Sequence, residues 1–126
     1  MPLDIDTYKT GDLAFVRLKG SLTAGVSLSI AEGRVQQAIS DGAKKLLLDI
    51  GQISYADSSG LGMLMQSFAA AQRGECALRI VGANQKLRDL LQTMRLDTIL
   101  TLDPDVDTAL KKFFTAAATD KTSNPD

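Results

Sequence analysis

The stretch that decides the fold is residues 44–73, which read KKLLLDIGQISYADSSGLGMLMQSFAAAQR. It opens with a continuous apolar run around Leu46, Leu47 and Leu48, the pattern of a sheet strand that is covered on both faces. Small polar residues follow, and apolar residues then recur at spacings of three and four until Arg73-Gly74. The stretch therefore predicts a buried strand that passes directly into an amphipathic helix beginning near Ser58.

The flanking sequence predicts strands that alternate with helices. The predicted strands are residues 3–9, 13–19, 44–50, 76–81 and 98–102, the first two joined into a hairpin by Gly11-Asp12. The predicted helices are residues 26–39, 58–73, 84–94 and a last one that follows Pro104. The resulting order, ββαβαβαβα, predicts an α/β fold with a central mixed sheet and helices packed on it.

The length of 126 residues fits one domain. We expect this domain to cover residues 1–114, because the apolar pattern of the last helix ends near there. Residues 115–126 are small or polar and predict a flexible C-terminal tail. Each helix stripe is accounted for by the one sheet, so a monomer is expected.

Composition narrows the class of function. The net charge is −1 and the basic residues are scattered, so no nucleic-acid partner is expected. No apolar run is long enough to span a bilayer, and Asp4 and Asp6 lie where a signal peptide would be basic, which predicts a cytoplasmic protein without direct membrane insertion. The chain has no histidine, the commonest general base and zinc ligand, so we expect no catalytic residues, no metal and no cofactor. The single cysteine, Cys76, lies in an apolar run and predicts a buried thiol.

The motif Asp57-Ser58-Ser59-Gly60-Leu61-Gly62 stands at the junction of the decisive strand and helix. The free N–H groups and the dipole of a helix start favour a negative charge there, whether from Asp57, a bound anion or a phosphoserine. A phosphoserine would add a charge of about −1.5 to −2 and would repel an acidic or apolar partner surface. A simpler interpretation is that Asp57, Ser58 and Ser59 only cap the helix, an ordinary role worth ~1 kcal/mol. The motif alone leaves both interpretations open.

From Leu3 to Phe114 the chain resembles the STAS domain family, and especially its free-standing bacterial members. The resemblance rests on the Asp57–Gly62 motif after an apolar strand, with Gly82 and residues 87–91 fitting the same pattern downstream. It implies that Ser59 is a phosphate acceptor, that Ser58 caps the helix and that Asp57 lies beside the partner surface. It also makes Gly60, Leu61 and Gly62 part of the partner-binding segment.

The resemblance further implies the function of an anti-sigma factor antagonist that works by partner switching. The unphosphorylated protein would bind an anti-sigma factor, a serine kinase, and so free a sigma factor. Phosphorylation of Ser59 by the kinase would inactivate the antagonist, and a phosphatase would reset the cycle.

A second partner-facing loop departs from the family pattern. Where family members commonly read Gly-Glu-Leu-Asp, this chain reads Gly20-Ser21-Leu22-Thr23, which loses two acidic positions. Ser21 and Thr23 therefore predict a partner contact with altered electrostatics. Alternatively, the two residues only supply a turn and a helix-start signal ahead of Val26.

Two other functions remain open at this stage. The chain could be a fixed STAS subunit of a stress-signalling scaffold or of a lipid transporter complex. It could also bind a nucleotide through Gly60 and Gly62, although no Gly-Lys-Ser/Thr sequence follows them. The basic residues Lys86, Arg88 and Arg95 could form a basic contact for a partner, but they are interpreted as the solvated face of the third helix.

Overall fold

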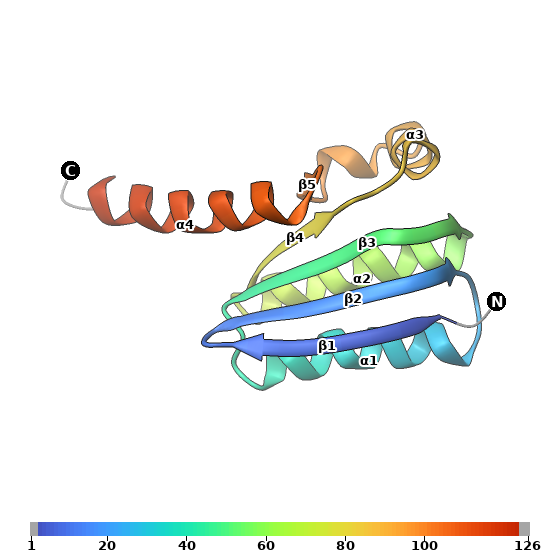
Figure 1. Ribbon diagram of the computed structural model, residues 1–126, viewed down its shortest axis with the longest axis horizontal. Coiled ribbons are helices and arrows are strands. Elements are labelled where there is room, and N and C mark those ends of the chain that lie inside the picture. The colour runs from blue at the N-terminus through green and yellow to red at the C-terminus, as the bar shows by residue number, and fades with distance from the viewer. Residues whose placement is uncertain (1–2, 124–126) are drawn as a thin grey trace.

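The computed structural model describes the backbone of residues 3–123 and the side chains of residues 3–114. Figure 1 shows the chain, whose elements run in the predicted order ββαβαβαβα, which is confirmed. The strands are β1 (Asp4–Thr10), β2 (Leu13–Leu22), β3 (Lys45–Ala56), β4 (Ala77–Val81) and β5 (Leu102–Asp103). The helices are α1 (Val26–Ser40), α2 (Ser58–Arg73), α3 (Gln85–Thr93), the short 3-10 helix η1 (Leu96–Thr98) and α4 (Val106–Ser123).

The five strands form one mixed sheet in the sequential order β1-β2-β3-β4-β5. β1 and β2 are antiparallel and joined by a tight turn in which Gly11 has a φ of 61°, a conformation that favours glycine. The later strands are parallel, since each follows a helical or long connection that returns the chain to the same end of the sheet.

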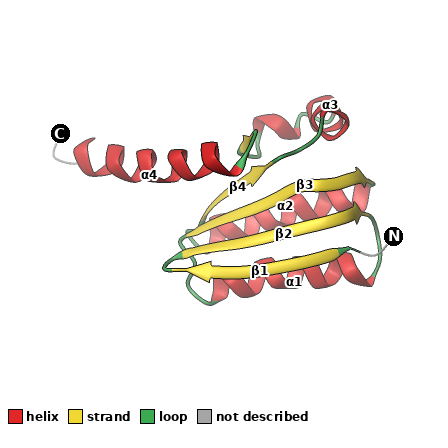
Figure 2. Cartoon of the chain, in the orientation of Figure 1, coloured by secondary structure: helices red, strands yellow, loops and turns green. Residues whose placement is uncertain are grey.

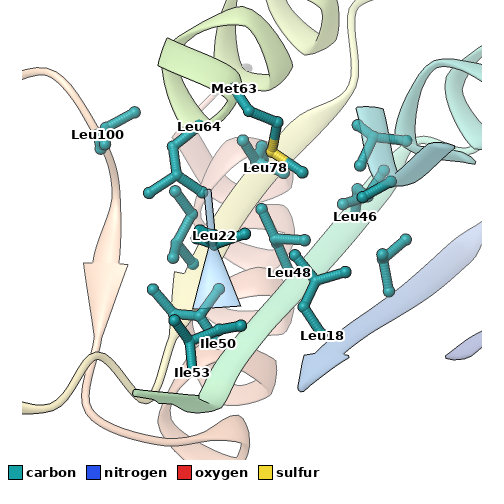
Figure 3. Close-up of a cluster of buried hydrophobic side chains, with 14 of the residues drawn as sticks. Leu18, Leu22, Leu46, Leu48, Ile50, Ile53, Met63, Leu64, Leu78 and Leu100 are labelled. Carbon is teal, nitrogen blue, oxygen red and sulfur yellow. The ribbon is translucent and has the colours of Figure 1, made fainter. Parts of the chain in front are cut away.

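The strand β3 is covered on both faces, as its apolar run predicts. Leu46, Leu48 and Ile50 point into the larger core, which α1 and α2 close, whereas Leu47 points to the other face, against α4 residues that include Phe113. Figure 2 shows α1 and α2 side by side behind the sheet, with α4 apart from them. Figure 3 shows part of the larger core, where Met63 and Leu64 of α2 lie among leucines of the strands.

The prediction of a strand over residues 98–102 is wrong for most of that range. Residues 96–98 form the 3-10 helix η1, and only Leu102 and Asp103 pair with β4. The backbone donors of this segment are satisfied locally, because Leu100 N–H donates to the carbonyl of Leu96 at 2.8 Å. A segment whose donors close a turn cannot also offer them to a neighbouring strand.

Helix α4 continues to Ser123, through the segment for which a flexible tail is expected. Residues 116–118 are all alanine, which has the highest helix propensity and extends the helix once packing has started it. Residues 124–126 of the expected tail lie outside the described residues. The flexibility of the tail and the domain boundary at Phe114 stay predictions.

A buried carboxylate ties α4 to the edge of the sheet. Asp103 of β5 has a fully buried side chain that accepts hydrogen bonds from Arg79 of β4 (3.2 Å from Nη2) and pairs with Lys112 of α4 at 2.9 Å. Burial alone would raise the pKa of Asp103, but the hydrogen bonds from Arg79 and Lys112 outweigh it and hold that pKa below its usual range. The ionised carboxylate therefore holds three elements together.

The first turn of α2 lies directly on the last residue of β2. Asp57 N–H donates to the carbonyl of Leu22 at 3.0 Å, and a Cβ at Gly60 would collide with that carbonyl oxygen and lie 2.7 Å from the Cβ of Leu22. Only glycine permits this approach. It sets where the motif sits relative to the sheet.

We expect Gly60→Ala to destabilise the protein by about 1–3 kcal/mol, because the collision with Leu22 forces backbone shifts that outweigh the better helix propensity of alanine. Gly62 is the matched control: a Cβ there meets nothing within 4 Å, so Gly62→Ala should stabilise by up to about 1 kcal/mol. Urea unfolding of both variants measures the difference. Equal stabilisation by the two substitutions would contradict the close approach.

We expect Asp103→Asn to lower the free energy of unfolding at pH 7 by about 1–3 kcal/mol, because it weakens the charged contacts with two partners, Arg79 and Lys112. The lowered pKa of Asp103 means that its ionised form stabilises the fold above the unfolded-state pKa of about 3.9 and that this stability is lost as pH falls through the folded-state pKa. The difference in free energy of unfolding between the variant and wild type should therefore shrink below about pH 4. The control is Asp107→Asn, at an exposed position of α4, the helix that carries Lys112. A difference that stays constant with pH would contradict the role of the charge.

Candidate functional site

The motif lies at the end of the sheet where the parallel strands finish. β3 ends at Ala56 and α2 begins at Ser58, so Asp57 alone connects them. Figure 1 shows the carboxyl ends of β2 and β3 and the first turns of α1 and α2 at the same end of the molecule. In open α/β sheets this end is where ligands and partners usually bind.

Asp57 uses both carboxylate oxygens. Oδ1 accepts the N–H of Gly60 at 2.9 Å. Oδ2 accepts the N–H of Ala24, in the loop between β2 and α1, at 3.0 Å. These backbone hydrogen bonds, that from Ala24 foremost, hold the pKa of Asp57 below its usual range. The cap of α2 is therefore Asp57, and the expectation that Ser58 caps the helix is wrong, because Ser58 already belongs to the helix while Asp57 keeps an extended backbone.

The remaining motif residues divide by exposure. Ser58, Ser59 and Gly62 are exposed on the first turn of α2, where hydroxyl groups meet solvent at the positive end of the helix dipole. Gly60 and Leu61 are buried and hold that turn against the sheet. The six motif residues therefore lie together, but the solvent-exposed surface of the motif is formed mainly by the two serines and Gly62.

Ser21, near the end of β2, and Thr23, in the loop that follows, lie beside the motif. β2 extends further than expected, so Ser21 pairs with Tyr55 in the sheet register and Leu22 pairs with Ala56. Ser21 and Thr23 are half-buried. Neither caps α1, whose preceding residue is Gly25 and whose start has no side-chain cap.

A groove of about 580 Å³ opens beside the motif, between the start of α2 and helix α3. Its walls are mainly apolar and include the buried Leu61 and Leu87 and the half-exposed Tyr55 and Met94. Its polar lining residues are Asp57, Ser58, Lys86, Asp89 and Thr93. The Lys86 ammonium lies 5.8 Å from the centre of the Tyr55 ring, a cation–π arrangement.

Sequence reasoning missed this groove and assigned Lys86 to a solvated face. The available signal was Met94, which continues the apolar spacing of α3 although the helix ends at Thr93. Tyr55 carried a second signal, as a large aromatic residue directly before the motif. Neither showed that α3 would stand beside α2.

Two features of the described residues bear on chemical reactivity. Among residues 3–114 no three His, Cys, Asp or Glu side chains gather into a metal site. Cys76 is buried, as predicted, and burial raises the pKa of its thiol, which keeps it protonated. Within residues 3–123 no helix has the length and apolar character needed to cross a bilayer. What the site offers is an exposed serine pair beside an apolar groove.

Solved structures of similar fold include anti-sigma factor antagonists. One from Mycobacterium paratuberculosis is 19% identical over 87% of this chain and 92% of its own, with a TM-score of 0.75. A serine-to-glutamate variant of RsbS from Moorella thermoacetica is 18% identical over 90% of this chain and 97% of its own, with a TM-score of 0.79. The Bacillus cell fate determinant SpoIIAA in its phosphorylated form is 17% identical over 87% of this chain and 99% of its own, with a TM-score of 0.68. At these identities the likeness shows a shared fold.

Comparison with protein families matches residues 4–109 to the STAS domain. The match spans all five strands and helices α1, α2 and α3. The chain belongs to the STAS domain family.

Proposed function

We propose that this chain is a cytoplasmic anti-sigma factor antagonist that works by partner switching and is inactivated by phosphorylation of Ser59. Its unphosphorylated form binds an anti-sigma factor kinase and thereby frees a sigma factor, and a phosphatase restores that form. The observation that carries the proposal is the exposed Ser59 hydroxyl on the first turn of α2, next in the chain to Ser58, which lines the open apolar groove.

The surface around Ser59 suits a protein partner. Tyr55 and Met94 at the groove are 49% and 50% exposed, and Val26 and Ile30 on the first turns of α1 are 77% and 47% exposed. Large apolar side chains that stay in water mark contact surfaces when they gather around one site. Aromatic residues and methionine are also enriched where proteins bind one another. The apolar contact area would therefore surround the modified serine.

The position of Ser59 also suits a modification that switches binding without unfolding the domain. A phosphate in the first turn of a helix meets the positive end of the helix dipole, which favours it. The same charge would make the adjoining apolar surface costly to cover with a partner, because the phosphate would have to lose water. Phosphorylation would then change the interface and leave the fold intact.

The geometry argues against the alternative of a nucleotide site at Gly60 and Gly62. Gly60 is buried against β2, and its N–H already donates to the carboxylate of Asp57. A nucleotide phosphate at this turn would therefore find that N–H donor already occupied. The motif is therefore better suited to covalent modification of an exposed hydroxyl than to holding a phosphate ligand.

We expect Ser59→Asp to weaken partner binding about tenfold or more, because a permanent negative charge imitates the phosphorylated state at the contact surface. Purified wild type, Ser59→Ala and Ser59→Asp serve as baits in lysate of the source cells, and mass spectrometry identifies what each retains. A protein with an ATP-binding kinase domain should be held by wild type and Ser59→Ala and lost by Ser59→Asp.

The matched control is Ser40→Asp, which adds the same charge at an exposed serine at the far end of α1. It should retain the same proteins as wild type. If all baits retain the same proteins, the partner-switch proposal fails, and a fixed STAS subunit of a signalling scaffold or transporter complex becomes the better explanation.

A second experiment tests the acceptor itself. Incubating the protein with ATP and the kinase retained by the wild-type bait should add one phosphoryl group. After trypsin digestion, that group should be found on the peptide of residues 46–73. Fragmentation should place it on Ser59, since Ser58 and Ser54 on the same peptide are also exposed and act as internal controls. The phosphoryl group should be absent from Ser59→Ala. Modification of Ser58 or Ser54 instead would contradict the assignment.

A further inference from the structure

The loop between β2 and α1, residues 23–25, depends on Asp57 for its position beside the motif. The N–H of Ala24 donates to Oδ2 of Asp57 at 3.0 Å, and the following residue, Gly25, begins α1 without any side-chain cap. On the motif side, Asp57 N–H bonds the Leu22 carbonyl at 3.0 Å. Asp57 therefore bonds the chain on both sides of Thr23, so this loop and the serine turn meet at one residue.

The loop leads into exposed apolar surface. Val26 and Ile30 lie one turn apart on α1, so their side chains share a face, and both are exposed. The start of α1 lies at the same end of the molecule as the start of α2, the helix that carries Ser59 (Figure 1). A partner that covers the serine turn can reach the start of α1 only if the loop between them keeps its place.

We propose that Asp57 is a positioning residue for partner binding: its Oδ2 fixes the β2–α1 loop beside the Ser58-Ser59 turn, so that both segments form one contact surface. The partner is that of the proposed function, on which this inference rests. The role is distinct from the helix cap, since the cap uses Oδ1 and the loop contact uses Oδ2.

Asparagine at position 57 separates the two roles. Its single side-chain oxygen can still accept the N–H of Gly60, and asparagine caps helices about as well as aspartate. Its amide nitrogen is a donor and cannot accept the N–H of Ala24. Asp57→Asn should therefore keep the start of α2 and release the loop, whereas Asp57→Ala should lose both.

The first test is amide hydrogen exchange followed by NMR, which needs no partner. In Asp57→Asn the Ala24 amide should exchange about tenfold faster than in wild type, while the Leu61 amide inside α2 should change by less than about threefold. The matched control is Asp105→Asn, the same atomic change at a carboxylate whose Oδ1 accepts the N–H of Thr108 at 2.8 Å at the start of α4. It should leave Ala24 unchanged. Unaltered exchange at Ala24 in Asp57→Asn would overturn the inference.

The second test measures affinity for the protein that the wild-type bait retains, purified and titrated by calorimetry. Asp57→Asn should bind it about tenfold more weakly, while Asp105→Asn should bind like wild type. Wild-type affinity in Asp57→Asn, with faster exchange at Ala24, would show that the loop contact is not needed for binding and would overturn the inference. Retention of every partner by Ser59→Asp is a separate result: it removes the proposed switch without bearing on the loop.

Discussion

The close approach of α2 to the last residue of β2 is the constraint on which the site depends. It requires glycine at position 60, and it brings the backbone of Asp57 within hydrogen-bonding distance of Leu22. Two segments more than thirty residues apart in sequence thereby become neighbours. Because the contact is made largely by backbone atoms, it fixes the direction of α2 without using the side chains of the two serines. Those hydroxyl groups stay free in water.

The rest of the domain supports this arrangement from both faces of β3. The larger core packs α1 and α2 on one face, and the smaller cluster holds α4 on the other through Phe113. The smaller cluster buries less apolar surface, and the ionised Asp103 adds a directed contact there through Arg79 and Lys112. Over residues 46–50, β3 is therefore packed on both faces, and this strand is the platform that leads to Asp57.

The sequence is sufficient to predict the order of the elements, because local periodicity carries that information. The apolar run of β3 and the spacing of Leu87 and Leu91 are each readable within one segment. The errors arise where distant residues decide: residues 96–100 satisfy their donors in a turn, and Asp103 is buried only because Arg79 and Lys112 reach it. The site divides in the same way. The serines were readable as a motif, while the second contact of Asp57 and the groove beside α3 required the folded structure.

The same division explains why the fold of this family does not determine the partner. The contacts that build the platform are backbone hydrogen bonds, a glycine and buried apolar residues, and they can persist at the 17–19% identity shared with the structures compared above. Recognition instead uses exposed side chains, which nothing in the platform constrains. In this chain uncharged Ser21 and Thr23 stand beside the motif, and exposed Val26 begins the adjoining helix. These positions add no charge, so any charge attraction at this surface would come from Asp57, Lys86 and Asp89 of the groove, while the rest of the contact would be apolar.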